Sequence, residues 1–247
     1  MEEQPTSELT KKERKELRRA EREERHKGAA RGELVQKVGW WAAGALIVLG
    51  GAALLVWAVM QQNKDIEQAP LADQITAQDH VLGNPDASVV LLEYGDFQCP
   101  ACGTYHPVLK QLKAEYSDRV AFVYRHFPLT SIHKSADISA RATEAAALQG
   151  KFWEMHDKLF ENQQEWTTGN DEEVIMGYAQ GLGLNMDQFR ADINSEGVKN
   201  AVEQGRLSGV RSSVNSTPSF FLNGVKIQNP RSLQAFKDLL DQALATQ

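Results

Sequence analysis

Cysteine is nearly absent from this chain of 247 residues and occurs only at Cys99 and Cys102. A framework of several structural disulfides is therefore excluded. A zinc site built on two separated cysteine pairs is excluded as well, because such a site needs two further ligands and no second pair exists. The six histidines are scattered and none forms an H-x3-5-H pair, so zinc at these cysteines would require distant histidines to converge.

A strong excess of charge is also missing. The formal net charge is −6, and charged residues make up 24% of the chain, which is typical of an ordinary soluble domain with a charged tail. This balance gives no indication of nucleic acid or another polyanion as a partner. Internal repeats are absent too, and the chain beyond about residue 75 is long enough for one domain with its own core.

The two cysteines that are present lie within the sequence FQCPAC at residues 97–102. An apolar run at 89–92 precedes them, and helical patterning at 104–116 follows. The positive end of a helix stabilises a thiolate, so we predict Cys99 as the attacking thiolate and the more deeply placed Cys102 as the resolving thiol. A passive disulfide is a weaker alternative, because it would close a loop of only two residues and constrain the unfolded chain little.

A second feature is an apolar run at residues 38–60 that no charge interrupts. A helix of this length rises about 34 Å, enough to cross a hydrocarbon core of about 30 Å. Trp40, Trp41 and Trp57 lie near its two ends, where such rings favour the headgroup level. A buried helix of a soluble domain usually has a polar stripe, and a cleaved signal peptide has a shorter apolar core. We therefore predict one uncleaved transmembrane signal anchor.

The distribution of positive charge predicts the orientation of this anchor. Lys64 is the only basic residue close behind it, whereas the segment before it contains Arg18, Arg19, Arg22, Arg25, Lys27, Arg31 and Lys37. Positive flanks stay cytoplasmic, so the charged tail at 1–37 is expected inside the cell. The polar linker at 61–78 and the C-terminal domain are then expected outside, periplasmic or on the cell surface, where disulfides persist.

The remaining chain alternates between strand and helix patterns. Strands are predicted at 88–94, 119–126 and 219–222, and Asn223-Gly224 indicates a hairpin turn before a further strand at 225–227. Several helices punctuated by glycines are predicted between about 132 and 206. A last amphipathic helix is predicted at 232–244. The domain is therefore of the α/β class.

This order of elements, with C-P-x-C after the first strand and Thr-Pro before the hairpin, resembles the DsbA-like thiol:disulfide oxidoreductases. Three stretches are similar to membrane-anchored or secreted bacterial members of that family, namely residues 79–85, 93–102 and 216–224. The resemblance implies a thioredoxin fold at residues 79–247 with an inserted helical subdomain at about 132–206. The predicted transmembrane helix and the tail lie outside it.

The resemblance also implies roles for individual residues. Cys99 matches the nucleophile and Cys102 the resolving cysteine. Pro218 matches the cis-proline that faces the dithiol. Thr217 matches the position that tunes the redox potential and offers its backbone as an edge to an extended substrate.

Glu93 matches an acid that the family buries beneath the active site, where burial raises its pKa and allows it to take the proton of Cys102. The alternative for Glu93 is a water-facing residue at a strand end. Pro100 and Ala101, between the cysteines, are expected to contact substrate. They depart from the Pro-His pair of the best-known oxidases, so one stabiliser of the Cys99 thiolate is missing and a weaker oxidant is expected.

The function implied is a membrane-anchored extracytoplasmic thiol:disulfide oxidoreductase that oxidises cysteines of secreted or membrane proteins. Its expected redox partner is a quinone-linked thiol oxidase of the membrane, and neither a bound cofactor nor a metal is expected. Two alternatives remain open. One is a reductase or isomerase in the same compartment, and the other is a tethered thioredoxin-like binding module without catalytic activity.

Overall fold

The computed structural model describes residues 74–169 and 171–246, together with 40, 50, 51, 54, 57 and 72. The chain divides into two units, residues 1–68 and 69–247. The predicted charged tail, the predicted anchor and most of the predicted linker lie outside the described residues. The five described residues of the first unit are helical. Among the helices that the structure describes, none combines the length and the apolar character needed to cross a bilayer.

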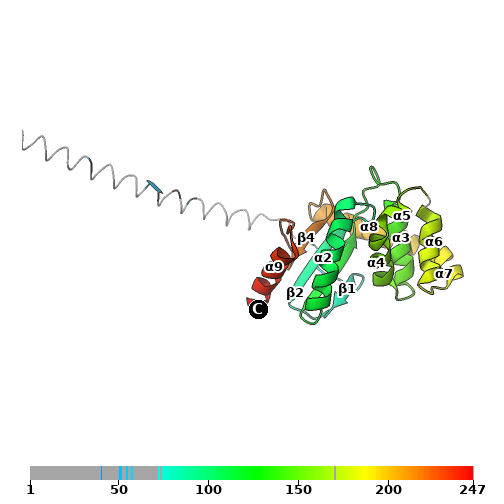
Figure 1. The fold of residues 1–247 in the computed structure, drawn as a ribbon, viewed down its shortest axis with the longest axis horizontal. Coiled ribbons are helices and arrows are strands. Elements are labelled where there is room, and N and C mark those ends of the chain that lie inside the picture. The colour runs from blue at the N-terminus through cyan, green and yellow to red at the C-terminus, as the bar shows by residue number, and fades with distance from the viewer. Residues whose placement is uncertain are drawn as a thin grey trace, which may run out of the picture. The chain divides into compact units, whose positions relative to one another are not determined.

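The second unit alternates strands and helices along the chain (Figure 1). Its strands are β1 (His80–Gly83), β2 (Val89–Gly95), β3 (Val120–His126), β4 (Ser219–Leu222) and β5 (Val225–Lys226). Its helices are α2 (Pro100–Tyr116), α3 (Ala136–Ala147), α4 (Phe152–Glu161), α5 (Gln163–Trp166), α6 (Asp171–Gly181), α7 (Met186–Asp192), α8 (Glu196–Arg211) and α9 (Leu233–Ala245). The predicted α/β class is confirmed.

The strands form one mixed sheet in the order β1-β3-β2-β4-β5. The central pair, β2 and β3, is parallel and is connected through α2, whereas the remaining pairs are antiparallel. The register places Glu93 of β2 between Tyr124 of β3 and Phe220 of β4. Strand β1 was not predicted from the sequence, because four residues at a sheet edge carry too little pattern to be distinguished from a loop.

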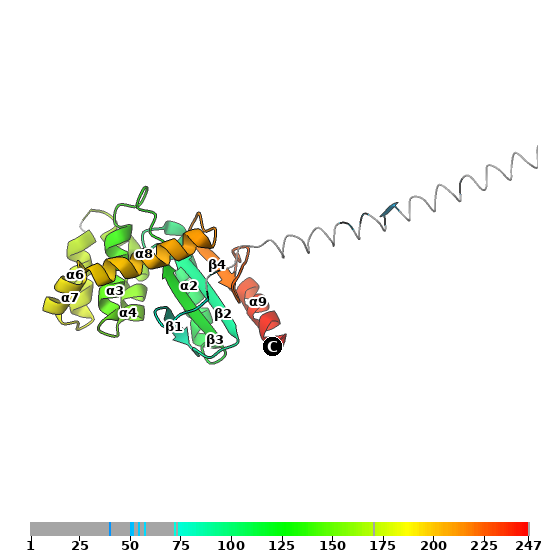
Figure 2. The ribbon, with the colours of Figure 1, turned by 180° about the vertical axis from the view of Figure 1, so that it is seen from behind.

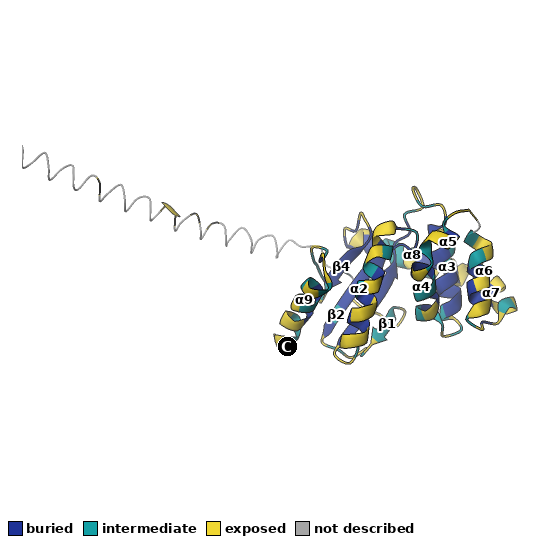
Figure 3. Cartoon of the chain, in the orientation of Figure 1, coloured by how far each residue is buried: buried dark blue, intermediate teal, exposed yellow. Residues whose placement is uncertain are grey.

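The central strands are buried on both faces, and they appear dark blue in Figure 3. Leu91 packs with residues of α2 and α9, including Leu112 and Phe236. Its neighbour Leu92 points to the opposite face and packs with Phe127. Successive strand residues alternate between faces, so the apolar run predicted as a buried strand contributes to two separate cores.

Helices α3 to α8 form the insertion, which extends a few residues beyond the predicted range of 132–206. Their core contains Met155, Leu159 and Trp166, and it also includes Cys99 and Cys102. The dithiol thus lies at the junction between the sheet and the insertion. Figure 2 shows α8 running from the neighbourhood of α6 and α7 across the back of the sheet.

Helix α8 approaches β3 closely because it carries glycine where it crosses the strand end. A Cβ atom added at Gly209 would collide with the ring of Phe127, and one added at Gly205 would lie 3.0 Å from the carbonyl oxygen of His126. The small residues therefore allow the insertion to pack directly on the backbone that follows the central strands.

Candidate active site

The two cysteines occupy the junction between β2 and α2, as predicted. Cys99 is the N-cap residue of α2, and Pro100 starts the helix, where no backbone donor is needed. Both cysteines are free thiols, and the exposed fraction is 7% for Cys99 and 1% for Cys102. Pro100 and Ala101 are exposed beside them. A substrate can therefore approach Cys99 along an exposed rim, whereas Cys102 lies behind it.

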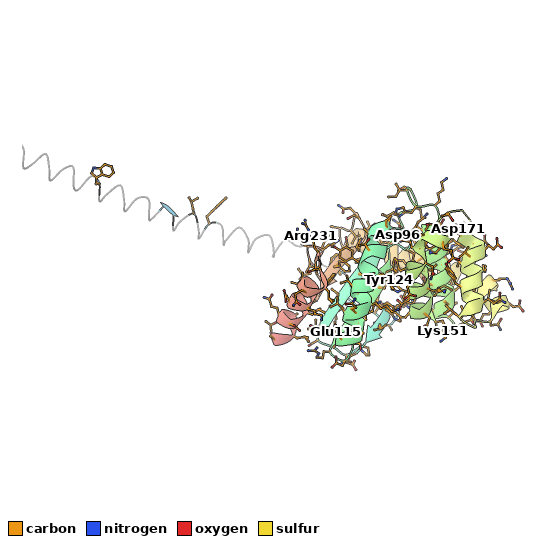
Figure 4. All side chains as sticks on the ribbon, viewed as in Figure 1. Asp96, Glu115, Tyr124, Lys151, Asp171 and Arg231 are labelled. Atoms are coloured by element: carbon orange, nitrogen blue, oxygen red, sulfur yellow. The ribbon has the colours of Figure 1, made fainter. Side chains whose placement is uncertain are left out.

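Asp96 holds the turn that presents Cys99. Its backbone carbonyl accepts a hydrogen bond of 3.0 Å from the Cys99 amide, and its Oδ1 accepts one of 2.8 Å from the Gln98 amide. Its Oδ2 accepts from the Leu129 amide at 2.9 Å and from His133 Nδ1 at 2.7 Å. Asp96, labelled in Figure 4, is a buried turn cap that connects the dithiol turn to the loop after β3.

Gln163 of α5 fastens the other side of the same turn. Its Nε2 donates to the carbonyl oxygens of Phe97 at 2.7 Å and of Cys99 at 2.8 Å. The amide fits because residue 103 is glycine: a Cβ atom there would lie 2.5 Å from Gln163 Oε1. Gln163 was not predicted from the sequence, and no sequence signal points to it, because only the folded insertion brings α5 to the dithiol.

The Thr217–Pro218 segment lies against Cys99, as the resemblance implied. The bond between the two residues is cis. The Cys99 thiol donates to the Thr217 carbonyl oxygen over 3.4 Å. The Thr217 hydroxyl is buried and has no hydrogen-bond partner in the described part of the chain. It is therefore free to donate when Cys99 becomes a thiolate.

The pKa of Cys99 is lowered from 9.0 to about 5. The largest cause is a hydrogen bond from the Cys102 side chain. Burial acts in the opposite direction, and hydrogen bonds from the Thr217 side chain and from the amides of Cys102 and Ala101 lower the pKa further. These amides belong to the first turn of α2, whose N–H groups have no partner within the helix. These hydrogen-bond donors stabilise the Cys99 thiolate, although the residue before Cys102 is alanine and not the histidine of the best-known oxidases.

Cys102 behaves in the opposite way. Burial raises its pKa well above 9.0, and the hydrogen bond that it gives to Cys99 raises it further. The pKa of Glu93 is raised from 4.5 to about 7, mainly by burial, while the positive charge of Lys113 lowers it. Glu93 is only 7% exposed, so its predicted burial is confirmed and the water-facing alternative is wrong.

Lys113 is a further member of the site that the sequence analysis missed. Its ammonium group lies 4.5 Å from the centre of the Trp153 ring. With Glu93, Tyr124 and Trp153 it lines a small cavity with room for about one water molecule. Figure 4 shows Tyr124 between the sheet and the insertion. A sequence signal existed, because Lys113 lies four residues after Leu109 and therefore on the buried stripe of α2.

Histidines that are scattered in the sequence converge in the fold. His106 is buried on α2, and it shares Asp157 with His156. His80 and His126 similarly share Glu144. Among the described residues, neither cysteine belongs to a cluster that could hold a metal ion.

Comparisons with known proteins agree with this geometry. A thioredoxin family model matches residues 76–242. Alpha-DsbA1 of Wolbachia pipientis is 22% identical with a TM-score of 0.63, covering 70% of this chain and 94% of that protein. Oxidised BdbD of Bacillus subtilis is 23% identical with a TM-score of 0.62, over 72% and 98%. A thioredoxin-like oxidoreductase of Silicibacter pomeroyi is 26% identical with a TM-score of 0.58, over 68% and 93%.

Curated relatives carry a different name. The Na(+)/H(+) antiporter NhaA 3 of Salinispora tropica is 34% identical over 82% of this chain and 33% of its own length. The NhaA 1 antiporter of Mycolicibacterium vanbaalenii is 40% identical over 62% of this chain and 24% of its own length. The chain thus spans about a third or less of these relatives. The family model establishes that this chain belongs to the thioredoxin family, and the two DsbA-type structures share its fold.

Proposed function

We propose that this protein is a thiol:disulfide oxidoreductase that oxidises cysteine pairs of secreted or membrane proteins to disulfides. The observation that carries this proposal is that the pKa values of the two thiols are shifted in opposite directions. Cys99 has a pKa of about 5 at the exposed helix end, and Cys102 has a raised pKa behind it. One sulfur is therefore accessible and a good leaving group, and the other is shielded.

The proposed reaction starts from the Cys99–Cys102 disulfide. A substrate thiolate attacks the Cys99 sulfur, a bond forms between these two sulfurs, and Cys102 leaves as a thiolate that needs a proton. Glu93, which has a pKa of about 7 and interacts electrostatically with Cys102, supplies that proton. A second substrate thiolate then attacks the first substrate sulfur and releases Cys99 as a thiolate. The substrate loses two electrons and the enzyme gains them.

The stabilised Cys99 thiolate favours oxidation as the direction. A low pKa stabilises the reduced enzyme, and a stable reduced form makes the disulfide form a stronger oxidant. The value of about 5 lies between roughly 3.5 for the strongest oxidase of this kind and about 7 for thioredoxin. We therefore expect a moderately strong oxidant.

The proposed location is the cell membrane, with a cytoplasmic N-terminus and an extracytoplasmic catalytic domain. The apolar run at 38–60 and the basic residues before it support this arrangement. The proposed electron acceptor is a quinone-linked thiol oxidase of the same membrane, which would restore the disulfide. Reduced secreted or membrane proteins are the proposed substrates.

The alternatives are distinguishable from this proposal. A reductase or isomerase would use the same residues with electrons flowing toward the substrate. A binding module would need neither thiol to react. We do not extend the transport activity named for the antiporter relatives to this chain, since it spans about a third or less of their length.

The deciding measurement is the reduction potential of the Cys99–Cys102 pair, determined on the full chain in glutathione buffers. A value closer to about −120 mV than to −270 mV is expected for a donor of disulfides. A value near about −270 mV, the thioredoxin range, would contradict the oxidising direction. A dithiol that never equilibrates with glutathione would support the binding module.

The compartment has its own test. After brief reduction of intact cells with dithiothreitol, a membrane-impermeant thiol reagent should modify Cys99 in the parent chain, while a Cys99→Ser variant, in which only the 1% exposed Cys102 remains, serves as the control. Modification that requires lysis of the cells would overturn the extracytoplasmic location.

A further inference from the structure

Three metal-ligating side chains from three elements meet beside a cavity of about 440 Å³. His80 lies on β1, His126 ends β3, and Glu144 lies on α3. Both histidine Nε2 atoms donate to the same oxygen, Glu144 Oε1, over 2.9 Å each. We propose that these residues bind one divalent transition-metal ion, with zinc as the best match, and that one coordination position remains open to the cavity.

The fold brings the two histidines together through strand register. His80 pairs directly with Tyr124 across the β1–β3 ladder, and His126 is two residues further along β3. Directly paired residues and residues two apart share a face of the sheet, so both imidazoles project to the same side. The His80 ring stacks on Phe152, with centroids 3.6 Å apart and planes at 10°. The donors are therefore positioned before any ion arrives.

The chemistry of the donor set suits zinc. Two imidazoles and one carboxylate are ligands that zinc sites use, and three protein ligands leave a fourth position for water. Tetrahedral bonds of about 2.0–2.1 Å separate ligand atoms by about 3.3 Å, so a small outward shift from the observed 2.9 Å suffices. Binding of an ion to both Nε2 atoms would require each neutral imidazole to carry its proton on Nδ1, so both rings would change tautomer.

The residues that line the cavity carry both signs of charge, with Asp79 and Glu144 opposite Arg125 and Arg211. Glu144 is the one carboxylate of the donor set, and its Oε1 accepts a hydrogen bond from each histidine. Asn200 and Gln204 of α8, both uncharged, contribute to the cavity wall. Arg125 lines the same cavity, but its guanidinium pairs with Asp79 at 2.6 Å.

The second histidine cluster, formed by His106, His156 and Asp157, has a similar donor set but faces a buried cation. Lys113 lowers the pKa of both His106 and His156, although burial is the larger cause for each. A positive charge that opposes a proton on these rings also opposes a metal ion. This cluster is therefore the matched control within the same molecule.

The test uses the full chain with Cys99 and Cys102 both replaced by serine, because thiolates also bind zinc. Titration with Co²⁺ alone should give one bound ion per chain with visible absorption bands, and Zn²⁺ should displace it. Adding His80→Phe keeps a ring against Phe152 and removes one ligand, and Glu144→Gln removes the charge. Each should weaken binding about 100-fold or more, whereas His106→Phe should leave binding unchanged.

Circular dichroism and thermal unfolding of each variant establish that its fold is intact. Absence of Co²⁺ binding in the folded double-serine chain would overturn the proposal. Binding that survives both His80→Phe and Glu144→Gln, or that is lost with a folded His106→Phe chain, would overturn it as well. The use of a thiol-free chain keeps this outcome independent of the proposed redox activity.

Discussion

The mouth and the interior of the active site contain acids whose pKa values are shifted in opposite directions, downward for Cys99 and upward for Cys102 and Glu93. Burial raises the pKa of Cys99, Cys102 and Glu93 alike. At the mouth, donors from Cys102, Thr217 and the first turn of α2 prevail and bring Cys99 to about 5. In the interior, Glu93 has the opposing charge of Lys113, which does not offset the burial. At Cys99 the hydrogen-bond donors therefore outweigh burial, whereas at Glu93 the nearby positive charge does not.

The largest effect is expected from removing the accessible thiol at the mouth of the site. Cys99→Ser should lower the rate of disulfide transfer to a reduced protein about 1,000-fold or more, because the accessible sulfur is lost. Cys102→Ser should instead accumulate mixed disulfides through Cys99, which non-reducing gel electrophoresis detects. Mixed disulfides that form through Cys102 in the Cys99→Ser chain would reverse the assignment of the two roles.

The next effect concerns proton transfer in the interior. Glu93→Gln should slow reduction of the enzyme disulfide about 100-fold at pH 7, because the departing Cys102 thiolate loses its proton donor. The pH profile of the parent should show an inflection near 7, following the pKa of Glu93. Lys113→Met should move that inflection to higher pH, since Lys113 lowers this pKa. Stopped-flow fluorescence of a thiol substrate measures both, and an unmoved inflection would contradict the coupling.

The same carboxyl should affect stability in a pH-dependent manner. Because the folded pKa of Glu93 is raised from 4.5 to about 7, the folded parent loses free energy of unfolding as the pH rises through this window. Glu93→Gln should therefore gain about 2–3 kcal/mol relative to the parent between pH 4 and pH 8. Urea unfolding at the two pH values measures the difference. Equal changes in parent and variant would mean that Glu93 is not perturbed.

A smaller effect concerns the donors at the mouth. Alkylation of Cys99 by iodoacetamide should increase with pH through a midpoint near 5 in the reduced parent. Thr217→Val removes a hydroxyl that stabilises the thiolate and should move the midpoint to higher pH. Ser219→Ala, a buried hydroxyl two residues further on that donates to Ser216, is the control and should leave the midpoint in place.

The smallest effect is expected where Gln163 of the insertion hydrogen-bonds to the turn that contains Cys99. Gly103→Ala should cost about 1 kcal/mol, because the new methyl group displaces the Gln163 amide from the Phe97 and Cys99 carbonyls. In a Gln163→Ala background the same change should be neutral or stabilising by up to about 1 kcal/mol, since alanine favours the helix. A double-mutant cycle of unfolding free energies measures this coupling. Additive changes in the unfolding free energy would mean that the hydrogen bonds of Gln163 do not depend on the residue at position 103.

Sequence reasoning located the dithiol well because its signals are local. The apolar run before Cys99, the proline after it and the helical pattern of α2 are contiguous, so spacing alone predicted the strand, the turn and the helix. Thr217 and Pro218 lie more than a hundred residues away and were assigned only through the family resemblance. The structure places the Thr217 carbonyl 3.4 Å from Cys99 Sγ.

Residues whose role depends on contacts between distant elements could not be predicted from the sequence. Gln163 reaches the dithiol turn from α5, and the position of α5 depends on how the insertion folds back on α2. The short edge strand β1 was missed because its four residues carry too little pattern to be distinguished from a loop. Without its pairing to β3, nothing in the sequence places His80 near His126.

The sequence by itself determined the α/β class, the place of the dithiol at a strand-to-helix junction and the approximate extents of β2 to β5, α2 and α9, since these follow from local periodicity and turn signals. Only the tertiary structure decided the ionisation of Glu93 and the convergence of His80, His126 and Glu144. Desolvation, charge pairing and ligand geometry depend on atoms that meet across elements, and their separation along the chain carries no information about those distances.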